Sequence, residues 1–563
     1  MKKFTKPVRK IPTVREGLGI RTIPEMLERN GEKYSDNTAY LIPRVNNIYT
    51  LSYGQVLKYV KRLGRYLKEL GLGKGDNIAI LGENRPEWGI SYFSVAWIGA
   101  TAIPLDTRAS LDFYKSALKF SSAKAIILSG SYLSDIEAIH DRLDELKHII
   151  LMDNLDEICS KFANGVGMEN VSSDNILEIL FTSGTTGEPK GVMLTHGNVL
   201  SNVDDIYKII ELHPDDRAFS ILPIHHSYEC TAGLITPFYN GVSVFYARSF
   251  KPSEMMEDLQ VAQPTMWLNT PLILEKLYLR IERELSKQKG FKGLATRILP
   301  KKFIGNQIKK KMGLNRIRFV LSGGAALPVW VSKGLEEFGF PILQGYGLSE
   351  ASPLISVSPP SNPNNESIGM IIPSAEVEIR NIDVEGNGEI VARGPNIMKG
   401  YYKNENATKE VLTTDGWLMT GDVGYFDEKG YLYITGRKKF VIVTRGGKNI
   451  FPEEVEEKLI KSPYIEEVLV FSPDDESIQA IIYPNIDGVR TKLQNVGKQV
   501  NDDNVWEFIR SEVRNVNETL EIYKRIRHFA ISYEEFPKTT TRKIKRHLFR
   551  NINLNRETKV VRD

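Results

Sequence analysis

The chain has 563 residues, of which 41% are hydrophobic and 26% are charged, as in an ordinary globular protein. This composition excludes a collagen-like, a disordered or a small disulfide-stapled chain. The 74 basic and 70 acidic residues leave a net charge of +4, which is too even to indicate nucleic acid as a partner. Because the length exceeds the ~250–300 residues at which one hydrophobic core stops growing, we expect at least two structural units.

Cysteine content and hydropathy indicate the compartment. The 2 cysteines, Cys159 and Cys230, allow at most one disulfide, which favours a reducing environment. The basic start, MKKFTKPVRK, leads into polar residues and lacks the apolar core of a secretion signal. The longest apolar run, Tyr92 to Leu105, contains a proline and is shorter than the ~20 residues that span a bilayer. We therefore expect a cytoplasmic protein.

Helical and strand patterns alternate through the first half of the chain. Apolar residues recur at helical spacing from Ser52 to Leu70, just before Gly71, and predict a helix. The short apolar segments 77–81 and 123–128 predict strands, and a further helix is expected after Asn84. Strands separated by helices of about 10–15 residues indicate βαβ units and parallel sheets.

The pattern changes between residues 368 and 433. Segments 375–380, 388–393 and 431–434 alternate in polarity and are separated by Gly-rich turns, which is typical of antiparallel strands. After Gly436 the pattern is again mixed α/β, and the remaining chain is long enough for a small domain. The sequence therefore predicts an α/β protein with a large domain at 1–436 and a small domain at 437–563.

The most informative segment is a loop that follows a strand-like segment at 176–181. Its six residues are all hydroxylated or glycine: Thr182, Ser183, Gly184, Thr185, Thr186 and Gly187. Such a loop can turn tightly and present N–H groups and hydroxyls to a phosphate, to which Lys190 adds a positive charge. It is not a Walker loop, because Pro189 precedes Lys190 and Gly191 follows it. By composition alone, a flexible surface loop is an equal alternative.

The string from Ile179 to Gly191 resembles the phosphate-binding signature of the adenylate-forming enzymes. This family comprises acyl-CoA synthetases, nonribosomal-peptide adenylation domains and firefly-type luciferases. Further similar segments follow in order from about Leu51 to Arg546. The resemblance implies a large domain of parallel sheets flanked by helices, with a distorted antiparallel barrel-like part. It also implies a small mobile C-terminal domain, with a hinge near Lys439.

The resemblance assigns the nucleotide site to residues in four segments. Ser349 would bind a phosphate oxygen, and Glu350 would hold Mg²⁺, for which carboxylate oxygen is a suitable ligand. Asp422 would accept hydrogen bonds from the ribose hydroxyls. Ser349 stands where the family usually has Thr. The remaining ATP- and AMP-binding residues are Gly324, Ala325, Gly345, Tyr346, Gly347 and Arg437, in addition to the loop at 182–187.

Other segments indicate the acyl and thiol sides. His226 in LPIHHSYE, with Gly323, would face the acyl group, while His225 would be a neighbour. No further ligand with suitable spacing is near this pair in the sequence, so a metal is not expected there. The segment 536–544 resembles a motif whose lysine, here Lys543, reaches across the domain gap; Arg542 replaces its usual Gly. The thiol of coenzyme A would be guided by Gly446, Gly447 and Lys448.

The resemblance implies one reaction in two steps. A carboxylate attacks the α-phosphorus of ATP and pyrophosphate leaves, after which a thiol attacks the acyl-adenylate and expels AMP. Such transfers depend on positioning and charge neutralisation, here assigned to Lys543, Glu350, Ser349 and Lys190. Segments 82–88, 345–352 and 536–546 are most similar to long-chain fatty acid–CoA ligases. The leading hypothesis is therefore such a ligase, using ATP, Mg²⁺ and coenzyme A.

Several alternatives stay open. The acyl group could pass to a carrier protein, or the acid could be of medium chain length or aromatic. A catalytically silent nucleotide-binding protein is a third reading, although the expected charged groups are present. The sequence does not distinguish a monomer from a homodimer.

A basic stretch runs from Arg280 to Arg318. It has thirteen basic residues against the acids Glu282 and Glu284, and its apolar residues include Ile298, Leu299, Phe303 and Ile304. A solvated protein surface is the simpler interpretation. The alternative is peripheral contact with an anionic membrane at its inner face, because this composition is typical of interfacial segments. The basic residues are Arg280, Arg283, Lys287, Lys289, Lys292, Arg297, Lys301, Lys302, Lys309, Lys310, Lys311, Arg316 and Arg318.

Overall fold

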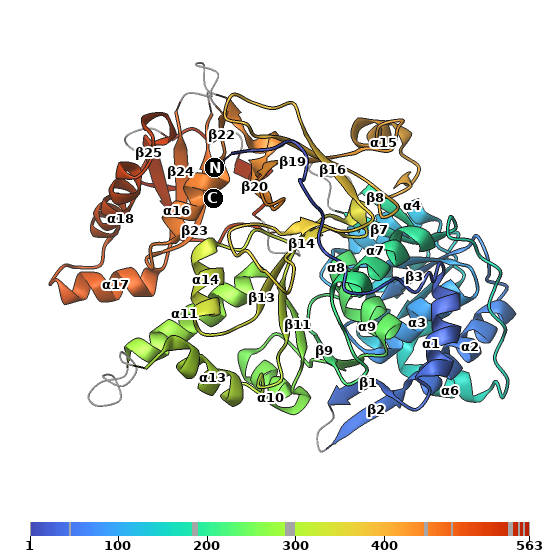
Figure 1. Ribbon diagram of the computed structural model, residues 1–563. Coiled ribbons are helices and arrows are strands. Elements are labelled where there is room, and N and C mark those ends of the chain that lie inside the picture. The colour runs from blue at the N-terminus through green and yellow to red at the C-terminus, as the bar shows by residue number, and fades with distance from the viewer. Residues whose placement is uncertain are drawn as a thin grey trace.

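The computed structural model describes residues 2–43, 47–182, 190–287, 299–443, 449–473, 477–538, 544–549, 552–554 and 558–561. Figure 1 shows a large body built from the N-terminal and central parts of the chain, with the C-terminal elements gathered at one side. Helices and sheets alternate in the large body, so the predicted α/β class is confirmed. Within the described ranges, no helix combines the length and the apolar character that crossing a membrane requires.

The first large sheet has the strand order β18-β8-β7-β4-β3-β5-β6 in the described part of the chain. Its strands from β7 to β6 are parallel, whereas β8 and β18 are added antiparallel at one edge. The strands predicted at 77–81 and 123–128 are both present. The bounds are β3 Asn77–Leu81, β4 Thr101–Pro104, β5 Ala125–Leu128, β6 His148–Leu151, β7 Ile176–Thr182, β8 Lys190–Thr195 and β18 Gly400–Tyr401.

The second large sheet has the order β15-β14-β13-β12-β11-β9-β10-β1-β2. It is parallel from β13 to β1 and antiparallel at both ends. The prediction of parallel sheets therefore holds for the centre of each sheet. The connections of the antiparallel pairs β1–β2, β7–β8 and β13–β14 are short, which suits antiparallel pairing because a parallel crossover needs a dozen or more residues. Strand β18 instead reaches β8 from a distant part of the chain. The bounds are β1 Thr38–Pro43, β2 Ile48–Ser52, β9 Arg217–Ser220, β10 Ser243–Tyr246, β11 Met266–Asn269, β12 Phe319–Ser322, β13 Ile342–Gly347, β14 Leu354–Val357 and β15 Met370–Ile371.

Helix α3 (Pro86–Trp97) packs between the two sheets and is buried on all sides except near its start. Such a helix has apolar residues all round rather than on one face. Helix α2 (Tyr53–Glu69) covers α3 and matches the helix predicted from Ser52 to Leu70. Its start is fixed by a capping box, in which the side chains of Ser52 and Gln55 each accept the other's backbone N–H.

The remaining helices of the large body surround the sheets (Figure 1), except that α9 is wholly buried and α8 nearly so. A π-helical segment, Cys230–Ile235, joins α8 to α9. The bounds are α1 Ile23–Lys33, α4 Leu111–Ser121, α5 Leu133–His140, α6 Leu155–Ser160, α7 His196–Ile209, α8 Ser227–Glu229, α9 Thr236–Asn240, α10 Pro252–Ala262, α11 Pro271–Ser286, α13 Lys301–Lys311, α14 Val329–Glu337 and α15 Glu405–Val411.

An antiparallel sheet with the order β16-β17-β19-β20 follows, as the alternating pattern predicted. Its strands are β16 Glu376–Arg380, β17 Gly388–Arg393, β19 Leu418–Phe426 and β20 Leu432–Arg437. The N-terminal segment lies along it: Phe4 and Phe426 exchange backbone hydrogen bonds of 2.8 and 3.1 Å, and Thr5 accepts one from Ile379. The first residues of the chain are thus fastened to strands made late in the sequence.

The C-terminal elements have a hydrophobic core of their own, drawn from residues 442–531. Four strands in the order β23-β24-β25-β26 are packed by three helices, and a two-stranded ribbon, β21-β22, precedes them. The bounds are β21 Ile442–Val443, β22 Asn449–Ile450, α16 Pro452–Ile460, β23 Ile465–Phe471, β24 Gln479–Pro484, α17 Ile486–Asn495, α18 Asp502–Glu518, β25 His528–Ser532 and β26 Val560–Val561. A domain boundary at 436–437 stays a prediction.

Candidate active site

Asp422 lies at the centre of the candidate nucleotide site. Its side chain is on β19, its residue is 4% exposed, and both carboxylate oxygens are engaged. Oδ2 accepts a hydrogen bond of 2.7 Å from the Tyr346 hydroxyl on β13, and Oδ1 pairs with Arg437 Nε at 2.9 Å. Asp422 and Arg437 are also register partners on β19 and β20. Three residues that the sequence placed in separate segments are therefore in direct contact.

Burial determines how Tyr346, Asp422 and Arg437 can interact with a ligand. Burial, with the nearby Asp422 carboxylate, raises the pKa of Tyr346 well above its ordinary value, so the hydroxyl stays protonated and donates. Arg437 is about half exposed, which leaves part of its guanidinium open to a ligand. An ionised acceptor, a flat ring and a cation at one place suit a ribose, a base and a phosphate.

Glu350, Tyr401 and Lys190 form a second cluster. The Tyr401 hydroxyl donates to Glu350 Oε1 at 2.8 Å, and Lys190 Nζ lies 5.0 Å from the centre of the Tyr401 ring. Burial and the Glu350 carboxylate raise the pKa of Tyr401, which keeps its hydroxyl a donor. Oε2 of Glu350 has no hydrogen-bond partner among the described residues, so this carboxylate fits the oxygen ligand that Mg²⁺ requires.

Tyr401 was not identified from the sequence. It lies in a strand of two residues, β18, which pairs with β8 next to Lys190. No periodicity marks so short a strand, and its partner is distant in the chain.

Thr182 is opposite Lys190 in the β7–β8 register, and its hydroxyl donates to the Lys190 carbonyl at 3.4 Å. The Ser349 hydroxyl is 3.3 Å from that of Ser227, so the hydroxyl stands beside the acyl segment.

The described glycines among the predicted site residues meet different surroundings, so a side chain at each position would have a different effect. Gly324 has a φ of +84° and no atom within 4 Å of the position that a Cβ would take, so it leaves open space in front of the backbone. Gly323 faces the ring of Tyr228 and Gly345 faces Leu354. At Gly347 a Cβ would come 1.8 Å from the Pro353 carbonyl oxygen, so packing alone demands glycine there. Ala325 is exposed beside Gly324.

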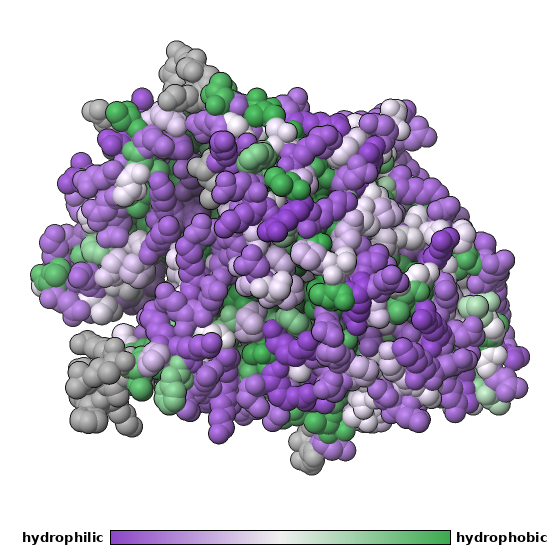
Figure 2. All heavy atoms as spheres, viewed as in Figure 1, coloured by the Kyte–Doolittle hydropathy of each residue, from purple (hydrophilic) through white to green (hydrophobic). Residues whose placement is uncertain are grey.

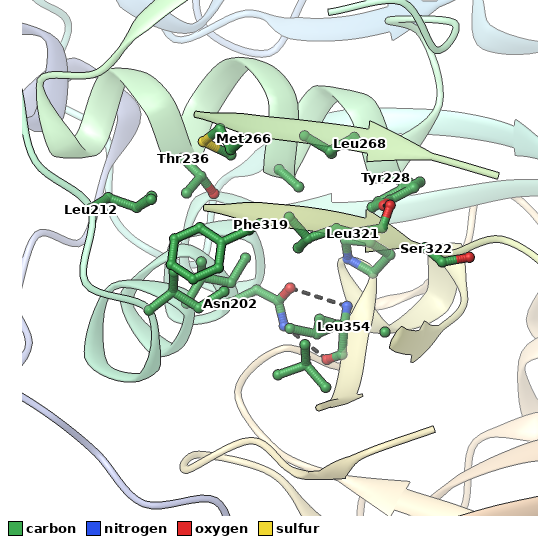
Figure 3. Close-up of a pocket in the computed structure, with 16 residues that line it drawn as sticks. Asn202, Leu212, Tyr228, Thr236, Met266, Leu268, Phe319, Leu321, Ser322 and Leu354 are labelled. Carbon is green, nitrogen blue, oxygen red and sulfur yellow. Dashed lines mark hydrogen bonds between the residues drawn. The ribbon is translucent and has the colours of Figure 1, made fainter. Parts of the chain in front are cut away.

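An apolar pocket begins beside these residues (Figure 3). It lies between α7, the helical segment from Tyr228 to Thr236, and strands β11 to β14. Asn202 lies in the wall of the pocket. Its side-chain N–H donates to the Leu354 carbonyl at 2.9 Å, and its side-chain oxygen accepts from the Leu354 N–H at 3.1 Å. Its free volume is about 50 Å³, room for only a few water molecules. The hydroxyls of Thr236 and Ser322 are buried there without a hydrogen-bond partner in the described structure.

His226 immediately precedes α8, next to His225, with the two rings 4.4 Å apart. Asp106, in the loop after β4, lies 3.4 Å from His225 Nε2. One ligand atom from each of the three residues lies within 4.8 Å of the others, a set that could hold a cation. The sequence predicted no metal here because no further ligand has suitable spacing near the pair in the chain, and the fold adds a third candidate ligand, Asp106, from a distant loop. Burial lowers the pKa of His225 well below its ordinary value, which keeps this ring neutral.

Two glutamates are buried behind the histidines. The Ser220 hydroxyl donates to Glu229 at 2.6 Å, and the Tyr92 hydroxyl donates to Glu178 at 3.1 Å. Burial raises the pKa of Glu229 to about 8 and that of Glu178 to about 7. Both carboxyl groups therefore hold a proton more tightly in the folded protein than in the unfolded chain.

Glu229→Gln is expected to remove part of the alkaline loss of stability. Since the folded-state pKa of Glu229 is raised from 4.5 to about 8, its contribution is full below about pH 4.5 and is lost as the pH rises to about 8. Each pH unit within this window costs about 1.4 kcal/mol per group. Thermal melts at pH 5.5 and 8.5 should show the Tm of E229Q rising relative to wild type at the higher pH. The exposed Glu428 provides the control, E428Q. An equal Tm difference at both pH values would contradict the assignment.

The other predicted site residues divide into two groups. Lys439 lies in the 3₁₀ turn Lys438–Phe440 directly after β20, and its neighbour Lys438 pairs with Glu389 at 2.7 Å. The rest lie outside the described residues: Ser183, Gly184, Thr185, Thr186, Gly187, Gly446, Gly447, Lys448 and Lys543.

Two family models match the chain. The model of the AMP-binding enzyme matches residues 27–402, and that of the AMP-binding enzyme C-terminal domain matches residues 439–555. Together they cover both nucleotide-side clusters except Asp422 and Arg437, which lie between the two matches.

Curated relatives are similar at modest identity. A peroxisomal long chain acyl-CoA synthetase 7 of Arabidopsis thaliana is 29% identical, over 86% of this chain and 77% of the relative. A long-chain-fatty-acid–CoA ligase of Bacillus subtilis is 29% identical, over 82% and 85%. A chloroplastic long-chain-fatty-acid–[acyl-carrier-protein] ligase of Arabidopsis thaliana is 27% identical, over 88% and 80%.

Among solved structures, the anthranilate CoA ligase AuaEII in complex with anthranoyl-AMP has the same fold. Its TM-score is 0.78 at 23% identity, and the match covers 94% of this chain and 96% of that chain.

Proposed function

Because this chain belongs to the AMP-binding enzyme family, we propose that it is an ATP-dependent fatty acid–CoA ligase. The observation that carries the proposal is the convergence of two polar clusters on one apolar pocket. Asp422, Tyr346 and Arg437 form the first cluster, and Glu350 with Lys190 the second. The lining of the pocket includes Gly345, which directly precedes Tyr346, and Ser322 on β12. A nucleotide, a metal–phosphate group and a hydrocarbon chain would thus meet at one point.

Each cluster has a distinct task in the proposed reaction. Asp422 and Tyr346 would hold the ribose and base, so that the α-phosphorus faces the mouth of the pocket. Glu350 would hold Mg²⁺, which neutralises charge on the phosphates when it is bound. Lys190 and Thr182 would retain the pyrophosphate as it leaves, and Lys543 would offset charge at the α-phosphate. The apolar lining of the pocket would disfavour water beside the acyl group.

The substrate panel that tests this proposal runs from acetate to oleate. The names of the long-chain relatives support a long straight-chain acid. We expect AMP release with fatty acids, and pyrophosphate exchange that depends on the acid. No AMP release with any acid would overturn the proposed function.

A second arm of the same assay distinguishes coenzyme A from a carrier protein as the acyl acceptor. We propose free coenzyme A as the acceptor, although one relative is named as an acyl-carrier-protein ligase. Acyl-CoA should accumulate when coenzyme A is added. Accumulation of acyl-adenylate, discharged only by a carrier protein, would favour that alternative.

We also propose that the enzyme works in the cytoplasm and touches anionic membrane through α13 and the residues around it. Leu299 and Phe303 are 41% and 51% exposed, and Lys302, Lys310 and Lys311 are exposed beside them. Ile304, expected at this surface, is instead buried in the core. Lys301 pairs with Glu337, and Lys309 donates to the Gly339 carbonyl, both at 2.7 Å. Lys289, Lys292, Arg297 and Ile298 lie outside the described residues.

This surface has more exposed lysines than exposed apolar residues. On the face that Figure 2 shows, hydrophobic residues are scattered among hydrophilic ones rather than gathered in a broad patch. Binding should therefore depend on salt, because lysines near an anionic leaflet contribute about 1 kcal/mol each within a Debye length. The acid itself partitions into bilayers, which gives the enzyme a reason to visit them.

Lys302, Lys310 and Lys311 provide the test, as the triple replacement by Gln. Sedimentation with anionic vesicles at low salt should show binding at least about a hundredfold weaker, since three charges are lost. The control carries the same change at Lys461, Lys492 and Lys498, which are exposed on the C-terminal elements. Octanoate turnover should be unchanged in both. If wild type ignores anionic vesicles at low salt, α13 is only a charged surface.

A further inference from the structure

His225 and Asp106 face each other as two ligands of one metal ion do. The side chain of His225 is 6% exposed and that of Asp106 is 16% exposed. His225 Nε2 lies 3.4 Å from Asp106 Oδ1, but in the described part of the chain this nitrogen has no hydrogen-bond partner. Buried polar atoms are nearly always hydrogen-bonded, so each exception requires an explanation. A metal ion between the two atoms would satisfy both.

The distance between these two atoms fits zinc. Zn²⁺ binds imidazole nitrogen and carboxylate oxygen at about 2.0–2.2 Å, with tetrahedral geometry. Two ligand atoms of such a tetrahedron are therefore about 3.3–3.5 Å apart. His225 Nε2 and Asp106 Oδ1 already have this separation. Neither side chain has to approach the other when the ion binds.

His226 supplies the third ligand. Its ring nitrogen lies within 4.8 Å of the other two ligand atoms, and the two imidazole rings are 4.4 Å apart. At this upper limit the spacing is wider than the edge of a zinc tetrahedron, so the His226 ring has to rotate inward. The ring is half-buried and therefore less confined than that of His225. A rotation of one side chain thus completes a site of three ligands.

Hydrogen bonds fix the two loops that carry the ligands. The Arg108 N–H donates to Asp106 Oδ1 at 2.9 Å. The Asn84 side chain donates to the Leu222 carbonyl at 2.7 Å and accepts from the Ile224 N–H at 3.0 Å, directly before the histidines. Supporting hydrogen bonds of this kind orient metal ligands, and their loss typically costs about 10–100-fold in affinity.

The donor set selects the ion. Imidazole nitrogen suits Zn²⁺, whereas Mg²⁺ takes oxygen ligands and keeps several waters. Mg²⁺ is therefore expected at Glu350 and not at the histidines. Three protein ligands leave the fourth tetrahedral position open, as in catalytic zinc sites. The charge of Arg108 acts on His225 and opposes a cation there, so one carboxylate has to offset it.

We propose that Asp106, His225 and His226 bind Zn²⁺, and that this ion competes with the acid for His226. The competition rests on the proposed function, in which His226 faces the acyl group. The neighbouring Ser227 hydroxyl is 3.3 Å from that of Ser349, so the ion lies close to the proposed site of reaction. While zinc holds His226, this ring is withheld from the acid. Zinc is thus an inhibitor of the ligase and is separate from its Mg²⁺.

Cobalt tests the metal site without any reaction, because Co²⁺ substitutes for Zn²⁺ and absorbs visible light when it is tetrahedral. Tag-free wild type should develop these absorption bands, and Zn²⁺ should abolish them. The zinc affinity, measured by competition with a chromophoric chelator, should fall at least tenfold in His225→Ala and in Asp106→Asn. Asp106→Asn keeps the size of the side chain and tests the site if H225A does not fold.

His213→Ala is the matched control. It removes an exposed histidine whose ring lies 3.8 Å from the Glu211 carboxylate, so it also separates a histidine from an acid. The zinc affinity of H213A should equal that of wild type.

The competition is measured with octanoate at saturating MgATP. Zinc at ten times its wild-type Kd should raise the KM for octanoate about tenfold in wild type, with kcat unchanged. In D106N, whose zinc affinity is at least tenfold lower, the rise should be about twofold or less. Zinc that binds ATP or pyrophosphate affects both proteins equally, so the difference between them reports the site.

The outcomes separate the proposals. No cobalt bands in wild type, or bands that persist unchanged in both H225A and D106N, would overturn the metal site. A KM that zinc raises equally in wild type and D106N, or lowers in wild type, would overturn the competition. No AMP release with any acid would overturn the proposed function instead, and the cobalt spectrum would still test the metal site.

Discussion

Lys543→Ala should slow adenylation about a hundred- to a thousandfold, the loss typical when one group that stabilises transition-state charge is removed. By the family resemblance, Lys543 would act where charge develops at the α-phosphate. It would have no such role when the thiol attacks a preformed acyl-adenylate. The second half-reaction, started from synthetic acyl-adenylate, should therefore stay within about threefold of wild type.

Lys545→Ala is the matched control for this variant. It removes the same charge two positions later in the same segment, where Lys545 is exposed. Pyrophosphate exchange measures the first half-reaction and acyl-CoA formation the second. Equal losses in both half-reactions would show that Lys543 is not specific to adenylation, and a comparable loss in K545A would point to the charge of the segment rather than to one residue.

Asp422→Ala should weaken ATP binding about ten- to a hundredfold. The ribose hydroxyls would lose an ionised acceptor, and a hydrogen bond to a charged group contributes about 1.5–3 kcal/mol. The Tyr346 hydroxyl and the Arg437 guanidinium would lose their partner as well, so both become less well positioned. Calorimetry with ATP gives the affinity directly.

Tyr346→Phe separates the effect of the Asp422 carboxylate itself from the effect of the hydroxyl that positions it. It removes the hydroxyl that holds Asp422 Oδ2 but keeps the flat ring and the carboxylate. We expect its ATP affinity to fall less than that of D422A. Unchanged affinity in a D422A protein that melts like wild type would refute the ribose role of Asp422.

The elements that sequence predicted well are those with strong local signals. Helix α2 has helical spacing, a capping box at Ser52 and a glycine after its end, and the structure gives Tyr53–Glu69. Strand β3 is a continuous apolar run and was placed at its observed bounds. The antiparallel edge strands of the two large sheets were missed, because pairing direction depends on how neighbouring strands connect and not on the composition of one strand.

The candidate site divides in the same way. Asp422, Tyr346 and Glu350 stand in recognisable segments, so the resemblance to the family was enough to propose them as site residues. Tyr401 and Asp106 have no such signal. Tyr401 reaches the site because β18 pairs with β8. Asp106 reaches it because the loop after β4 lies against the histidine pair. Contacts between residues far apart in the chain are decided by tertiary packing, which the pattern around either residue does not record.

The pairing of Phe4 with Phe426 has a consequence for how the protein is made. A ribosome produces the N-terminal segment hundreds of residues before the strand that receives it, so this contact has a very high contact order. Asp422 and Arg437 appear at the same late stage, on β19 and β20. If Asp422 accepts the ribose hydroxyls as proposed, a nascent chain that ends before it lacks this acceptor, and ATP cannot assist its folding because a ligand stabilises only the state it binds. Under that proposal the unfinished chain keeps its first residues available without help from ATP.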